Sequence, residues 1–98
     1  MARVIWSSRA ADDLEAICEY IECDSEKYAC LVAQRIISTV ERLGEFPESE
    51  SIVAEFQDLE LRDKIVHRYR IIYRIQKEIV EVVAMVHSSR QLTHILDS

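Results

Sequence analysis

The stretch that decides the fold is RDKIVHRYRIIYRIQKEIVEVVAMVH, residues 62–87. It holds two runs rich in Val, Ile and Tyr, residues 69–75 and 79–87, which are separated only by residues 76–78. Such residues pack well on a pleated surface, and so short a separation is typical of a β-hairpin. A third short run, residues 64–66, comes just before them, so the sequence predicts three consecutive strands.

Two arginines lie on one face of the run at residues 69–75. Strand alternation places Arg70 and Arg74 on the same side, about 7 Å apart, and both tyrosines of the run on the other side. An unpaired arginine is costly to bury. This face is therefore expected to have either acidic neighbours in solvent or an anionic partner.

The N-terminal part predicts a strand and a first helix. Residues 3–6 form an apolar run that is long enough for one strand. Ser7 and Ser8, followed by the acids Asp12 and Asp13 in the first turn, predict a helix start, because they satisfy free N–H groups and offset the helix dipole. Apolar residues then recur at helical spacing up to about residue 22.

A second helix and two further short elements complete the predicted order. Asp24 and Ser25 offer a new cap, and the next apolar stripe is expected to stop at Gly44, in the position of a left-handed cap, with Pro47 beyond it. The stripe is widened by two further apolar residues, so this helix is expected to be covered on more than one side. Residues 52–56 have the composition of a short strand, and residues 92–96 that of a final short helix.

The predicted fold is a single α+β domain over residues 1–98. Consecutive strands with short links pair antiparallel, and helices on one face of such a sheet give two layers. We expect an N-terminal strand, an α-helical hairpin packed on a twisted antiparallel sheet of about three to five strands, and a short C-terminal helix. The sheet face with the two arginines is expected to stay partly open.

Length and charge bound the class of protein. The chain has 98 residues, 49% of them hydrophobic, which is enough for one buried core. No signal-peptide pattern opens the sequence, and no apolar run approaches the ~18 residues of a membrane span, so a cytoplasmic chain without a membrane partner is expected. Residues 1–60 carry 5 basic and 14 acidic side chains, whereas residues 61–98 carry 7 and 4. Either the two halves neutralise each other or the basic half has its own partner.

Several classes of chemistry lack their motifs. A single glycine excludes a phosphate-binding loop, and no zinc-protease, nucleophile-elbow or zinc-cluster pattern occurs. We therefore expect no cofactor and no metal. Cys18, Cys23 and Cys30 are odd in number and lack C-x-x-C spacing, which argues against a disulfide framework. Cys18 is expected in the core.

Basic side chains and histidines gather in the C-terminal half, namely Arg62, Lys64, His67, Arg68, Arg70, Arg74, His87 and Arg90. If the strands pair as predicted, several of these converge on one side of the sheet. Guanidinium groups bind phosphates, and a histidine moves protons near neutral pH, so the set could cleave RNA by activating a 2′-hydroxyl. The alternative is that these charges keep the sheet soluble and that the histidines are structural.

Four segments resemble, in order, the ParE/RelE toxin superfamily. They are V-I-W-S-x-R-A-x-x-D-L at residues 4–14, L-x-x-F-P at 43–47, R-Y-R-I-I-Y-R-I at 68–75 and V-H-x-x-R at 86–90. The resemblance implies the toxin of a bacterial type II toxin–antitoxin pair, with a helical hairpin on a twisted antiparallel sheet.

The resemblance implies one of two activities. ParE-like members block DNA gyrase, whereas RelE-like members cut mRNA in the ribosome. For RNA cleavage, the resemblance assigns Arg70 and His87 as catalytic and Glu55 as a looser acidic match. The remaining basic residues are candidate contacts to the target or to nucleic acid, namely Arg62, Lys64, Arg68, Arg74 and Arg90.

Departures from the RNA-cutting pattern favour the ParE-like activity. Residues 88–98 contain no tyrosine, where RNA-cutting members usually place a catalytic one. Residues 45–60 are acidic, which weakens electrostatic attraction to a ribosome. A helical hairpin as long as residues 8–43 is also ParE-like. We therefore expect a gyrase inhibitor rather than an enzyme; the alternatives are a ribosome-dependent mRNA endonuclease and an inactive toxin-like binding module.

Every one of these alternatives implies a cognate antitoxin as partner. Its tail is expected to fold on this domain, as a helix along the helical pair or as a strand added to an exposed edge. The acidic helices predict that some antitoxin contacts are basic. A homodimer and a hetero-oligomer with the antitoxin are both compatible with the sequence.

Overall fold

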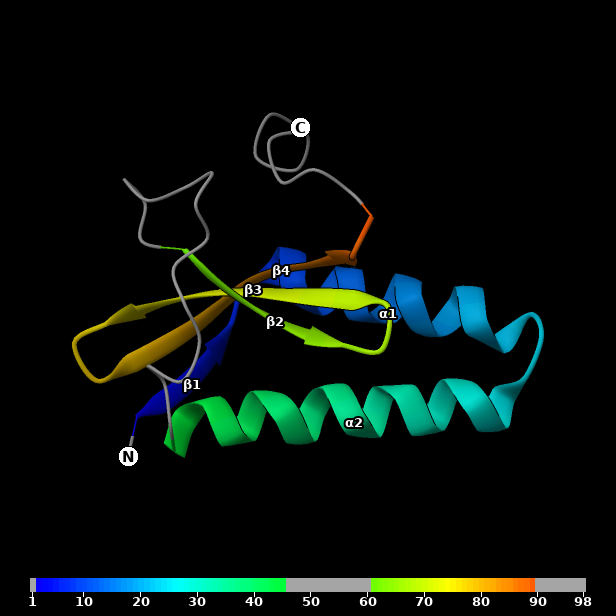
Figure 1. Ribbon diagram of the computed structural model, residues 1–98, viewed down its shortest axis with the longest axis horizontal. Helices are drawn as coiled ribbons and strands as arrows, with labels where there is room; N and C mark the ends of the chain where they lie inside the picture. Colours follow the sequence, from blue (N-terminus) through cyan, green and yellow to red (C-terminus); the bar gives the residue numbers. More distant parts are fainter. Residues whose placement is uncertain (1, 46–60, 90–98) are drawn as a thin grey trace.

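The computed structural model describes residues 2–45 and 61–89. Along the chain, the elements are β1 (Arg3–Trp6), α1 (Ser8–Glu22), α2 (Glu26–Glu45), β2 (Arg62–Val66), β3 (Tyr69–Gln76) and β4 (Ile79–His87). Figure 1 shows the two helices as an antiparallel hairpin beside the sheet, which confirms the predicted α+β architecture. The strand expected at residues 52–56 and the helix expected at residues 92–96 lie outside the described residues.

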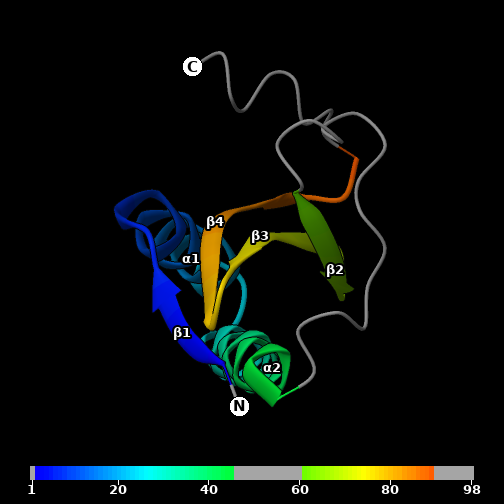
Figure 2. The same ribbon diagram turned by 90° about the vertical axis from the view of Figure 1, so that its left-hand side faces the viewer.

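Within the described residues, the sheet has four strands in the order β1-β4-β3-β2. Its two hairpins, β2–β3 and β3–β4, are antiparallel as predicted. β1 differs, because it pairs parallel to β4, with Trp6 opposite Val82. The rule that consecutive strands with short links pair antiparallel does not apply here, since both helices, β2 and β3 lie between β1 and β4 in the sequence. Figure 2 shows how the sheet curls from β1 to β2.

A β-bulge interrupts the pairing of β3 with β4. Ile72 lies opposite Ala84 and Tyr73 lies opposite Val82, so Val83 has no opposite residue. One extra residue reverses the alternation of side chains beyond it. Val82 faces the helices before the bulge, and Met85 faces them after it.

Two serine caps start the helices. Ser7 Oγ accepts a hydrogen bond from the Ala10 N–H at 3.0 Å, and Ser25 Oγ accepts one from the Tyr28 N–H at 3.0 Å. The expectation of acidic residues in the first turn of α1 is wrong, because that turn contains none. Neither helix of the described part is long and apolar enough to cross a membrane.

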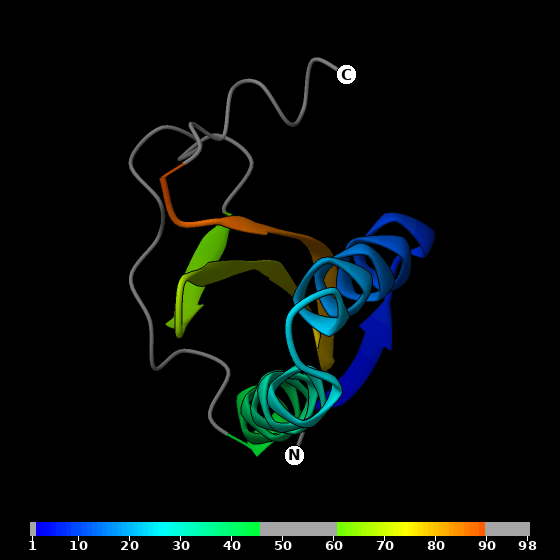
Figure 3. The same ribbon diagram turned by 90° about the vertical axis from the view of Figure 1, so that its right-hand side faces the viewer.

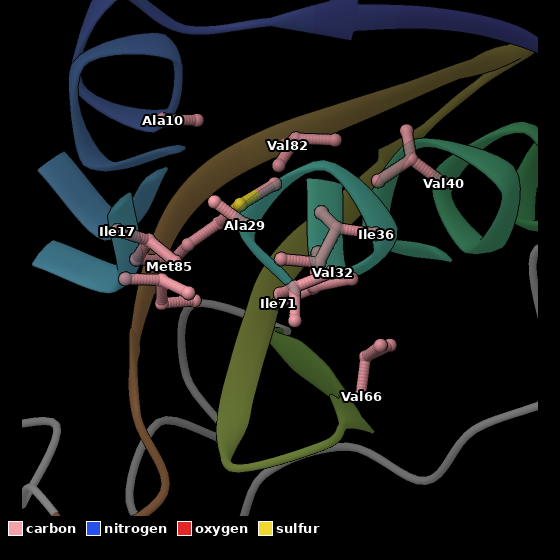
Figure 4. Close-up of a cluster of buried hydrophobic side chains, with 11 residues drawn as sticks. Ala10, Ile17, Ala29, Val32, Ile36, Val40, Val66, Ile71, Val82 and Met85 are labelled. Atoms are coloured by element: carbon pink, nitrogen blue, oxygen red, sulfur yellow. The ribbon is translucent and has the colours of Figure 1, made fainter. Parts of the chain in front are cut away.

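The main core lies between the helical hairpin and one face of the sheet. Figure 4 shows side chains from both helices meeting those of β3 and β4, with Ile36 and Ile71 fully buried. On α2, Leu31 and Ile37 are 53% and 42% exposed. The expectation that this helix is covered on more than one side is therefore wrong.

A smaller apolar cluster lies on the opposite face of the sheet. It contains Leu61, Ile72, Ala84 and Val86, all of them buried. The apolar run of β4 is continuous from Val82 to Val86, as is typical of a strand with both faces covered. The sheet face with the two arginines was expected to stay partly open, but the buried cluster shows that part of it is covered.

Gly44 serves close packing rather than helix termination. α2 continues to Glu45, and Gly44 has no positive φ, so the expected left-handed cap is wrong. A Cβ at this position would lie 2.9 Å from Val4 Cγ2 and 3.1 Å from the Ala2 carbonyl oxygen. The Ala2 N–H also donates to the Gly44 carbonyl at 2.8 Å. The glycine lets β1 approach the end of α2.

We predict that Gly44→Ala destabilises the chain by about 1–3 kcal/mol, because the half-buried Val4 and the Ala2 backbone would have to move to admit the methyl group. Urea denaturation measures the change in the free energy of unfolding. Ser38→Ala on the exposed side of α2 is the matched control, and it should be close to neutral. A Gly44→Ala chain at least as stable as the unsubstituted one would contradict the close approach of β1.

Candidate functional site

The two arginines of β3 are paired with acidic side chains. Arg70 Nε donates to Asp63 Oδ2 at 2.7 Å, and Arg74 Nε donates to Glu81 Oε1 at 2.5 Å. Both lie on the sheet face away from the helices, on either side of Ile72. The Arg70 side chain is 16% exposed and that of Arg74 is 40% exposed. The sequence left open whether these arginines face acidic neighbours or an anionic partner. In the structure, both have acidic neighbours.

The basic cluster predicted from the sequence is divided between the two faces. Arg70 lies opposite Val86, whereas the bulge turns the next side chain, His87, towards the helices, where its ring contacts Tyr69. His67 and Arg68 form the β2–β3 turn on that same side, and His67 adopts a left-handed backbone conformation with φ 55°. The structure therefore does not bring Arg70 and His87 together.

Two further predicted site residues lie on β2 rather than in the β2–β3 turn. Arg62 and Lys64 are half-buried on β2, on the same face as Val66, and each makes a further polar contact. Glu55 and Arg90 lie outside the described residues.

A groove of about 770 Å³ opens on the helix side of the sheet. It lies at the end where the helical hairpin extends beyond the β2–β3 turn (Figure 1), the end that faces the viewer in Figure 3. Side chains of both helices, of that turn and of the ends of β3 and β4 line it. They are Arg9, Asp13, Ala16, Ile17, Tyr20, Ile21, Asp24, Tyr28, Val32, His67, Arg68, Tyr69, Met85, Val86 and His87.

Aromatic rings form much of the groove wall. Tyr28 and His67 pack edge to face with ring centroids 6.2 Å apart, and Tyr69 and His87 do so at 5.8 Å. Burial raises the pKa of Tyr69 above its ordinary value, and the neighbouring Tyr20 and Tyr28 raise it further, against an opposing effect of Arg68. Tyr20 itself is 75% exposed.

Asp13 fixes α1 to β4 at the base of the groove. Its Oδ2 accepts a hydrogen bond from the Met85 N–H at 2.9 Å and lies 3.7 Å from Arg9 Nε. Beside it, Ser7 Oγ donates to the Val83 carbonyl at 2.8 Å. Sequence reasoning missed this role, because it treated Asp13 as a first-turn acid.

The cysteines and acidic residues show no metal site in the described part of the chain, where no group of three His, Cys, Asp or Glu could hold an ion. All three cysteines are free, and Cys18 is half-buried rather than fully in the core. Burial raises the pKa of the Cys18 thiol, as do the nearby Glu22 and Cys30.

Comparisons with known proteins show a toxin family and its fold. The model of the family described as the ParE toxin of type II toxin–antitoxin system, parDE, matches residues 4–92. Y4kP of Sinorhizobium fredii is 33% identical over 96 residues, which cover 96% of either chain. The toxin RelE2 of Caulobacter vibrioides is 33% identical over 91 residues, which cover 92% of this chain and 99% of its own. A solved structure of the chromosomal ParDE toxin–antitoxin system from P. aeruginosa shares the fold with a TM-score of 0.71 at 19% identity, over 89% of this chain and 96% of that chain.

We predict that Asp63→Ala lowers the free energy of unfolding by about 1.5–3 kcal/mol, because it leaves the shielded Arg70 guanidinium without its partner. Glu81→Ala, which removes the partner of the more exposed Arg74, should cost only about 0–1 kcal/mol. Urea denaturation of both variants checks the difference. Equal effects would mean that the two ion pairs do not differ in their shielding from water.

The raised pKa of Tyr69 predicts a loss of stability at alkaline pH. The folded chain holds the phenolic proton more tightly than the unfolded chain, whose tyrosine titrates near 10.0. The resulting stabilisation is complete below about pH 10 and is lost as the pH rises through the higher value of the folded state. The stability difference between the unsubstituted chain and Tyr69→Phe should therefore shift in favour of the variant as the pH rises above about 10. A constant difference would refute the shift.

Proposed function

The chain belongs to the ParE toxin family of type II toxin–antitoxin systems, and on this premise we propose that it is a binding inhibitor of DNA gyrase which a cognate antitoxin neutralises. The family match and the long helical hairpin, with 15 residues in α1 and 20 in α2, support this proposal. The proposal places this activity in the cytoplasm. There the chain would form a hetero-oligomer with its antitoxin or a homodimer.

The observation that carries the proposal is the separation of Arg70 from His87. Cleavage of RNA by proton transfer needs the proton-moving group and the phosphate-stabilising group at one phosphate. Here the two side chains lie on opposite faces of the sheet, and Arg70 Nε is already hydrogen-bonded to Asp63. This arrangement favours a toxin that acts by binding over one that cuts RNA.

A ribosome-dependent mRNA endonuclease is the second candidate. It is favoured by one specific observation, the 33% identity to a relative named RelE2. In this candidate, Arg70 and His87 are catalytic, with Glu55 as a weaker third residue and the other basic side chains as contacts to RNA. An inactive chain retained for antitoxin binding is the third.

A supercoiling assay tests the proposal directly. Purified chain at micromolar concentration should inhibit supercoiling of relaxed plasmid by gyrase, and prior addition of the cognate antitoxin should restore it. Unchanged supercoiling would count heavily against gyrase as the target.

A translating extract tests the second candidate in parallel. Under the gyrase proposal, transcripts remain intact when the chain is added. Transcript cleavage that Arg70→Ala abolishes would instead establish the endonuclease. Normal growth of bacteria that express the chain without antitoxin would support the inactive module.

A further inference from the structure

The edge of β4 is covered by three different partners in succession. β1 pairs with β4 as far as Trp6 and Val82, and the Ser7 N–H still donates to the Val82 carbonyl at 2.9 Å. Beyond that point the chain turns into α1. The Ser7 hydroxyl then bonds the Val83 carbonyl at 2.8 Å, and the Asp13 carboxylate bonds the Met85 N–H at 2.9 Å. The side chains of Ser7, which caps α1, and of Asp13 in α1 therefore take the place of a strand, but only as far as the Met85 N–H.

Two backbone groups follow on the same edge. The Ser88 N–H donates to the Arg68 carbonyl at 2.7 Å, so Ser88 is directed towards β3. Because strand backbone direction alternates, Met85 and His87 are directed away from β3. Within residues 2–45 and 61–89, no hydrogen bond involves the Met85 carbonyl or the His87 N–H on this side. Both residues line the groove.

We propose that an extended segment of the antitoxin adds to β4 at this point, in line with β1. The proposal rests on the assignment of the chain as an antitoxin-neutralised toxin. One residue of a parallel strand placed opposite Val86 would donate to the Met85 carbonyl and accept from the His87 N–H. A helix in the groove would leave both groups unpaired, because its own backbone groups are bonded internally.

The groove walls define the side chains that the segment should carry. Ile17, Tyr20 and Tyr69 present apolar surface, which fits an aliphatic or aromatic side chain of the added strand. Arg68 is exposed at the rim and has no ion pair with any other residue of the described part. An acidic residue of the segment would pair with it. At the groove, the antitoxin is thus expected to carry an acidic residue. Along the acidic helices, by contrast, it is expected to carry basic residues.

Amide exchange of the ¹⁵N-labelled chain tests the proposal. The probe is the cognate antitoxin, defined as the protein that restores growth to cells expressing the chain. In the saturated complex, exchange at the His87 amide should slow at least about tenfold, as expected for one new hydrogen bond. The Met85 amide, bonded to Asp13 in the free chain, is the internal reference. A His87 amide that exchanges equally fast in the saturated complex would overturn the added strand while leaving antitoxin binding established.

A pair of variants distinguishes the contribution of the His87 N–H to antitoxin binding from that of the His87 side chain. His87→Pro removes the N–H at an edge position where proline is tolerated, whereas His87→Ala keeps it. The dissociation constant of the antitoxin should rise about tenfold or more for His87→Pro and at most about threefold for His87→Ala. Gln76→Ala, at the exposed end of β3 by the β3–β4 turn and outside the groove, is the control for unrelated surface changes and should bind normally.

The amide spectrum of His87→Pro shows whether this variant is folded. The exchange measurement uses the unsubstituted chain and therefore tests the proposal even if the variant does not fold. Equal affinity of a folded His87→Pro chain would refute the proposal. Protection of the His87 amide by a single-stranded RNA oligonucleotide, but not by the antitoxin, would also refute it and would assign the groove to nucleic acid. Absence of any antitoxin binding would overturn the proposed function together with the inference.

Discussion

The extra residue Val83 in β4 is the constraint on which the arrangement of both faces depends. Before the bulge, Val80 and Val82 face the helices, and after it Met85 and His87 do. Without this reversal, the strand would direct His87 to the face of Arg70. The bulge also lies where β1 ends, so it marks the point at which α1 takes over the edge of β4 through Ser7 and Asp13. The β-bulge thus directs Met85 and His87 into the groove and separates His87 from Arg70, which lies on the other face of the sheet.

The ion pairs seen at Arg9, Arg70 and Arg74 in the described part of the chain are local, because each joins residues of the same half. Arg70 pairs with Asp63 and Arg74 with Glu81, so the partners of both arginines come from the basic half itself. The Arg9–Asp13 pair likewise lies within the acidic half. These pairs leave the charge difference between the halves intact. A basic sheet region beside acidic helices offers an antitoxin surfaces of opposite sign within a short distance.

Much of the fold could be predicted from the sequence, because periodicity and caps act locally. The β-hairpins, the two helices and the caps at Ser7 and Ser25 follow from residues a few positions apart. The parallel pairing of β1 and the close approach at Gly44 could not be predicted, since both join segments that are distant in sequence.

The candidate site was only partly predictable for a related reason. The pairing of Arg70 and Arg74 with acidic neighbours was one of two alternatives that the strand pattern left open. The convergence of Arg70 with His87 assumed strict alternation along β4, and no residue in the run from Val82 to Val86 marks the bulge. The role of Asp13 was missed because its partner, the Met85 N–H, is 72 residues away.

The most direct test of the account is the position of the His87 ring in solution. Nuclear Overhauser effects measured on labelled chain report which protons lie within about 5 Å of it, the range over which edge-to-face aromatic pairs meet. The bulge predicts contacts from the His87 ring to the Tyr69 ring and none to the Arg70 side chain. Contacts to Arg70 without contacts to Tyr69 would contradict the account, because they would place both side chains at one site.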